Sequence, residues 1–121
     1  MARPEAVRRV KSYSAATGYV YQYYFFEVQK KRHSLAPGTE YVYMVSIDRK
    51  KVFPVRILVR ADAADSRHRK TGLFLTGTEE YALAKLRLFQ ALDELTDLDR
   101  NHPELFVDQS NIESLLAQLD L

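Results

Sequence analysis

Residues 19–31 (YVYQYYFFEVQKK) form an almost unbroken run of aromatic and β-branched side chains, and this run limits the possible folds more than any other feature. Such residues favour a β-strand over a helix. The odd and the even positions of the run are both largely apolar. Glu27 and Gln29 favour turning the odd positions away from the core, but a slip of one residue would reverse every assignment. We therefore expect a central strand covered on both faces, or a strand whose second face meets a partner.

Two further strands are predicted at 39–47 (TEYVYMVSI) and 52–60 (VFPVRILVR), joined by the polar residues 48–51. A hairpin that closes around Arg49 and Lys50 would place Ile47 opposite Val52. The alternation of side chains along a strand then separates two faces. One face is apolar and contains Val42, Met44, Phe53, Val55, Ile57 and Val59; the other contains Tyr41, Tyr43, Val45, Arg56, Leu58 and Arg60. In this register Tyr43 lies directly opposite Arg56. Pro54 cannot donate a backbone hydrogen bond, which predicts a sheet edge or a bulge at that position.

The second half of the sequence predicts a polar, basic loop at 61–71, a short fourth strand at 72–77 and two helices. Thr76 and Glu79 have the spacing of a capping box, so a long helix is expected over about 78–96. Ser110 and Glu113 repeat that spacing before a short helix at about 111–120. A further short helix is predicted at 4–11. The fold expected is an α+β single domain of residues 1–121, with a three- or four-stranded antiparallel sheet (about 19–77) packed by the long helix and the C-terminal helix.

The net charge of +2 conceals an uneven distribution. Residues 1–70 contain 15 Lys and Arg and 6 Asp and Glu, whereas residues 71–121 contain 3 and 10. This division predicts a basic binding surface, an attraction between the two halves of one domain, or two copies that dock basic face to acidic face. The chain has no cysteine, which excludes disulfides. Neither a membrane-spanning apolar run nor a secretory signal is found, so we expect no membrane partner and a cytoplasmic location.

No motif in the sequence indicates catalysis. Gly72 and Gly77 have the glycine spacing of a phosphate-binding loop, but the lysine that should follow the second glycine is missing. The histidines His33, His68 and His102 are isolated and lack the paired ligands that announce a metal site. We therefore expect no catalytic residue, no cofactor and no metal, and an enzyme would require a pocket that the sequence does not show.

The favoured hypothesis is a non-catalytic interaction module that acts through homo-oligomerisation or a protein partner, because tyrosine and arginine are enriched in interfaces. The contact surface it predicts comprises Tyr19, Tyr21, Tyr23, Tyr41, Tyr43, Arg56 and Arg60. The alternative is a nucleic-acid-binding domain, in which those tyrosines stack on bases. It would add basic loops that track the phosphates: Lys30, Lys31, Arg32, Arg49, Lys50, Lys51, Arg67, Arg69 and Lys70. A small-ligand-binding domain is the second alternative and requires a pocket that a sequence does not show.

Overall fold

The structure is a computed structural model that describes residues 9–32, 36–47 and 49–120, and these ranges contain five strands and four helices. The α+β class agrees with the prediction. The strands are β1 (Lys11–Ser14), β2 (Val20–Lys31), β3 (Gly38–Ile47), β4 (Lys51–Arg60) and β5 (Leu105–Val107). The helices are α1 (Ala61–Thr71), α2 (Gly77–Glu94), α3 (Leu98–Asn101) and α4 (Ile112–Gln118).

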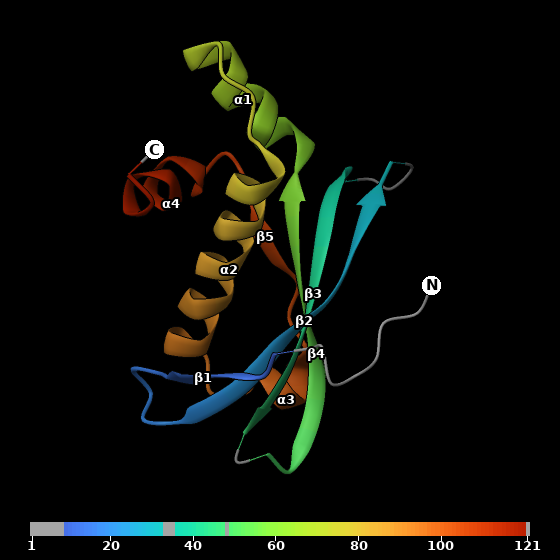
Figure 1. The fold of residues 1–121 in the computed structure, drawn as a ribbon, viewed down its shortest axis with the longest axis vertical. Helices are drawn as coiled ribbons and strands as arrows, with labels where there is room; N and C mark the ends of the chain where they lie inside the picture. The colour runs from blue at the N-terminus through green and yellow to red at the C-terminus, as the bar shows by residue number, and fades with distance from the viewer. Residues whose placement is uncertain (1–8, 33–35, 48, 121) are drawn as a thin grey trace.

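The strands lie in one sheet in the order β1-β2-β3-β4-β5, which is also their order along the chain (Figure 1). β1 to β4 are antiparallel neighbours, whereas β5 pairs with β4 in parallel. A parallel neighbour requires a long crossover, and α1, α2 and α3 supply it. The prediction of a purely antiparallel sheet of three or four strands is therefore wrong. β1 and β5 have four and three residues, too few for a recognisable alternation.

The three long strands and the two main helices lie close to their predicted positions, but three other segments differ. The segment 61–71 is helix α1, not a loop, because its alanines favour a helix and Gly72 ends it in the left-handed conformation (φ 75°). The predicted strand 72–77 is a connection outside the sheet. Of the helix predicted at 4–11, residues 4–8 lie outside the described residues, and Lys11 begins β1.

One of the two predicted capping boxes is confirmed. The Thr76 hydroxyl accepts a hydrogen bond from the Glu79 amide, and the Glu79 carboxylate accepts one from the Thr76 amide. The second is wrong, because α4 begins after Asn111 and Ser110 instead donates to the Asp108 carboxylate. Asp108 follows β5 directly, so this contact belongs to the turn that leaves the sheet.

The register of the β3–β4 hairpin is shifted by one residue from the prediction, and this changes which side chains of the two strands share a face. Ile47 pairs with Lys51, and the three-residue connection 48–50 holds Arg49 in the left-handed region (φ 59°). Tyr43 consequently lies opposite Val55, and Arg56 lies opposite Val42. A shift of one residue moves a side chain to the other face of a sheet, so the predicted separation of faces is wrong.

β2 contains a β-bulge between Phe25 and Glu27. A bulge inserts one extra residue and interrupts the alternation of side chains. Tyr23, paired with Val45, shares a face with Phe25, paired with Tyr43, whereas Glu27 pairs with Val42 on the opposite face. Glu27 was therefore a misleading guide to the orientation of the tyrosines, because the bulge separates them.

The core lies between the sheet and helices α2 and α4, which are on one side of the sheet (Figure 1). α2 contacts β4, β5 and α4. Its buried side chains Ala84, Leu88, Ala91 and Leu92 recur at helical spacing along one side, and Leu83 is also buried. Both main helices therefore cover the same face, called here the helix face; the opposite side is called the outer face.

Candidate interaction surface

The tyrosines that were predicted to form a contact surface lie mostly in the core. The exposed fractions of Tyr21, Tyr23, Tyr41 and Tyr43 are 1, 6, 5 and 0%, whereas Tyr19 is exposed. In the observed register of β2, β3 and β4 these four side chains lie on the helix face. They provide no outward aromatic platform, which was the feature that the nucleic-acid hypothesis required.

Tyr41 and Tyr43 form an aromatic cluster with Tyr81 of α2 and Phe25 of β2. The ring centroid of Tyr81 is 6.1 Å from that of Tyr41 and 6.3 Å from that of Tyr43, while Phe25 approaches it to 5.5 Å in an edge-to-face contact. Such edge-to-face geometry is favoured by the charge distribution of aromatic rings. The tyrosines of the sheet therefore serve to attach the first turns of α2 to β2 and β3.

The tyrosine hydroxyl groups beneath α2 differ in whether they have a hydrogen-bond partner. Tyr41 donates to the Glu80 carboxylate at 2.9 Å, and Tyr13 donates to the Asp93 carboxylate at 2.7 Å. The Tyr43 hydroxyl is buried beside Tyr81 without a hydrogen bond of acceptable geometry among the described residues. Burial is the main cause that raises the pKa values of Tyr13, Tyr41 and Tyr43, and the pKa of Tyr13 rises to about 12. The hydrogen bond to Asp93 raises the pKa of Tyr13 further, and the hydrogen bond to Glu80 does the same for Tyr41.

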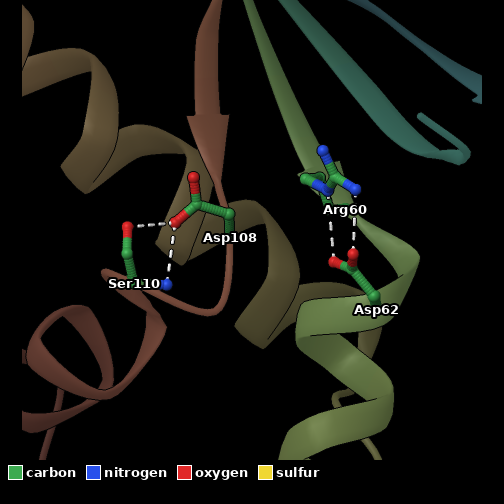
Figure 2. A network of polar contacts seen from close by, with 4 residues as sticks. All are labelled: Arg60, Asp62, Asp108 and Ser110. Atoms are coloured by element: carbon green, nitrogen blue, oxygen red, sulfur yellow. Dashed lines mark hydrogen bonds and ion pairs between the residues drawn. The ribbon is translucent and has the colours of Figure 1, made fainter. Parts of the chain in front are cut away.

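The two arginines of the predicted surface are engaged in ion pairs within the chain. Arg56 lies on the outer face, 3.3 Å from the Glu40 carboxylate. Arg60 forms two hydrogen bonds with Asp62 at 3.2 and 2.9 Å, across the junction of β4 and α1 (Figure 2). The hydrogen bonds and charge of Asp62 raise the pKa of Arg60. Arg60 thus fixes the start of α1.

The three basic clusters do not form one surface. The cluster of Lys30, Lys31 and Arg32 borders a hollow of about 390 Å³ that Arg60, Asp65 and Glu80 also line. Arg69 and Lys70 lie in the last turn of α1, whereas Arg67 is 93% buried and faces the interior. Arg49, Lys50 and Lys51 belong to the β3–β4 hairpin at the other end of the sheet. The structure therefore separates the third cluster from the first two.

A hollow of about 320 Å³ on the outer face is lined by β-strand side chains that include Gln22, Met44 and Ser46. A second hollow, of about 440 Å³, is lined by side chains that include Glu40, Arg56 and Leu58. Val42, near the centre of this face, is only 1% exposed, and Ser46 is 6% exposed. Val52 is half-exposed at the periphery. The centre of this face is therefore withdrawn from solvent, whereas apolar side chains at its periphery, such as Val20 and Val52, are exposed.

The edge of β2 is the more distinctive surface. β2 has 12 residues, but β1 pairs only with the segment from Val20 to Tyr23. Beyond that point Glu27–Lys31 pair with β3 on one side, and none of the described strands flanks them on the other. An edge without a neighbouring strand presents backbone donors and acceptors for pairing with another chain. Glu27–Lys31 is called here the β2 edge segment.

Apolar side chains are concentrated at the same place. Phe25 is 36%, Phe26 41% and Val28 49% exposed, within four consecutive positions of the chain. Charged side chains follow: Lys30 donates to the Thr39 hydroxyl at 3.2 Å, and Lys31 lies 3.7 Å from the Glu40 carboxylate. The sequence predicted an aromatic strand here but not its edge position, because that depends on how short β1 is.

Comparison with known proteins identifies no relative: no family model, no curated protein and no solved structure matches the chain. Within the described residues, no group of three or more His, Asp and Glu side chains is arranged to hold a metal ion. None of the described helices is long and apolar enough to cross a membrane.

Proposed function

We propose that the protein is a non-catalytic interaction module that binds another polypeptide by strand addition at the β2 edge segment. The observation that carries the proposal is the length of β2, whose second half extends past β1. In strand addition the main-chain hydrogen bonds supply affinity, and alternate side chains supply specificity. Val28 on the helix face and Glu27 on the outer face would be the side chains that a bound strand contacts.

The exposed apolar residues support this proposal. A long edge with exposed aromatic and β-branched side chains invites pairing, and proteins normally shorten such an edge or cover it. Val28 pairs with Tyr41 of β3, so it lies beside the aromatic cluster at the start of α2. A strand bound there would extend the sheet and cover part of the exposed side chain of Phe25.

The test is a selection of binders from a random library of extended peptides, displayed against the purified protein. We expect the selected peptides to bind Val28→Lys at least about tenfold more weakly than the natural protein, because a lysine on an edge opposes strand pairing. Val52→Lys is the matched control, since Val52 is a strand valine of similar exposure (53% against 49%) on a different strand.

Fluorescence anisotropy with labelled peptides would give the two dissociation constants, and far-ultraviolet circular dichroism would confirm that both variants are folded. The proposal would be overturned by a selection that yields no binder, or by binders that Val28→Lys and Val52→Lys affect equally.

A further inference from the structure

We infer that the polypeptide which pairs with the β2 edge segment is the same segment of a second copy, in an antiparallel arrangement centred on Gln29. This inference rests on the proposed function and names the partner of the same site. The symmetry expected of such a pair is a twofold axis, which makes both copies contribute identical surfaces.

The side chains of the segment divide cleanly between the two faces. Glu27 pairs with Val42, Gln29 with Glu40 and Lys31 with Gly38, so these three side chains lie on the outer face. Val28 and Lys30 pair with Tyr41 and Thr39 and lie on the helix face. A twofold axis perpendicular to the sheet places each outer-face side chain opposite an outer-face side chain of the second copy. The axis must therefore pass through one residue of the segment, and each choice of that residue defines one register.

Charge selects one of these registers. With the axis at Gln29, Glu27 of each copy faces Lys31 of the other, and this contact occurs twice. With the axis at Glu27 or Lys30, like charges would face each other, and with the axis at Val28 no ion pair would form. Opposite charges across neighbouring strands stabilise the pair, whereas like charges oppose it.

The surroundings of Lys31 suit this arrangement. Its ammonium group lies 3.7 Å from Glu40, and the Glu40 carboxylate also contacts Arg56 at 3.3 Å. Lys31 would therefore lie between Glu40 of its own copy and Glu27 of the other. Val28 would face Lys30 of the second copy on the helix face, where the aliphatic part of the lysine can cover the half-exposed valine.

Charge reversal tests the register. We expect Glu27→Lys and Lys31→Glu each to weaken self-association by about tenfold, because each replaces two attractive pairs by two repulsive ones. The double variant with both changes, and an equimolar mixture of the two single variants, should recover association because each restores opposite charges. Sedimentation equilibrium would measure the association constants, and thermal unfolding would show that each variant is folded.

A cysteine at the axis provides a test that leaves the charges unchanged. Since the chain has no cysteine, Gln29→Cys introduces the only thiol. Directly opposed residues of neighbouring strands lie within the range of Cα separations that a disulfide spans. We expect mild oxidation to link two Gln29→Cys copies efficiently, whereas the exposed control Val52→Cys should form far fewer dimers.

Three results would overturn the inference: a strict monomer at high concentration, a dimer whose association constant is insensitive to both charge reversals, or equal cross-linking of the two cysteine variants. If the selected peptides still bind and Val28→Lys weakens their binding, the proposed function stands, and only the identification of the partner as a second copy is wrong. If neither peptide binding nor self-association depends on Val28, both fail.

Discussion

Tyr41 and Tyr43 illustrate how two identical residues of one strand can have different energetic roles. Both rings are buried beneath the start of α2, and both contact Tyr81. The Tyr41 hydroxyl donates to Glu80, whereas the Tyr43 hydroxyl has no hydrogen bond of acceptable geometry among the described residues. Burying a polar group without a partner costs free energy, so the two hydroxyls should contribute with opposite sign.

Replacement of each tyrosine by phenylalanine tests this difference. We expect Tyr41→Phe to lower the free energy of unfolding by about 1.5 to 3 kcal/mol, the usual net value of a hydrogen bond to a charged group. Tyr43→Phe keeps the ring and should leave that free energy unchanged or raise it by up to about 1 kcal/mol. Urea denaturation of the two variants would measure both values. Equal destabilisation would show that the Tyr43 hydroxyl has an acceptor.

At the scale of elements, local signals predicted both main helices but only one of the two capping boxes correctly. The capping box of Thr76 and Glu79 was predicted from spacing alone, because it depends on residues within one turn. The hairpin register was wrong because the polar residues 48–51 permit loops of two or three residues. The choice of three places Arg49 in the left-handed region.

The cap of α2 provides a prediction at this scale. Thr76→Ala removes the acceptor for the Glu79 amide, which lies 3.1 Å from the Thr76 hydroxyl. We expect a loss of about 1 kcal/mol in the free energy of unfolding. Thr78→Ala is the control, since Thr78 is exposed in the first turn and is not the cap. A cap without energetic importance would give equal unfolding midpoints for the two variants.

At the scale of the whole molecule, the burial of several phenols makes stability depend on alkaline pH. Burial, and next to it the hydrogen bond to Asp93, raise the pKa of Tyr13 from 10.0 to about 12, and burial also raises the pKa of Tyr21, Tyr23, Tyr41 and Tyr43. The native state therefore retains phenolic protons that the unfolded chain releases. The contribution of each such tyrosine to the free energy of unfolding is therefore complete at a pH below its pKa in the unfolded chain. It is lost as the pH rises through its higher pKa in the folded protein.

We therefore expect the urea midpoint to fall between pH 10 and about 12 as the contribution of Tyr13 is lost. The Tyr13→Phe variant isolates that contribution and should fall less steeply over the same interval. Tyrosinate absorbance, measured in parallel, should appear together with unfolding. A native protein that ionises its phenols at the unfolded pKa and stays folded would contradict this account.

The interaction surface also belongs to the scale of the whole molecule. The predicted contact surface and the β2 edge segment both include part of β2, yet they have no residue in common. The tyrosines Tyr21 and Tyr23 are in the core, and the candidate contacts move to Glu27, Val28 and Lys31. Basic residues that were grouped by sequence are likewise divided between the two ends of the sheet.

The three long strands, the two main helices and the cap of α2 could be predicted from the amino-acid sequence, because alternation, helical periodicity and capping are local properties of the chain. Which face of each strand is buried follows instead from the way the strands pair in the fold. That choice depends on the bulge after Phe25 and on one residue in the β3–β4 loop, and each reverses the faces at little local cost. It also depends on the short length of β1, which leaves the second half of β2 as an edge. The aromatic run at 19–31 therefore fixed a strand, whereas tertiary pairing decided that its first half is core and its second half is the candidate surface.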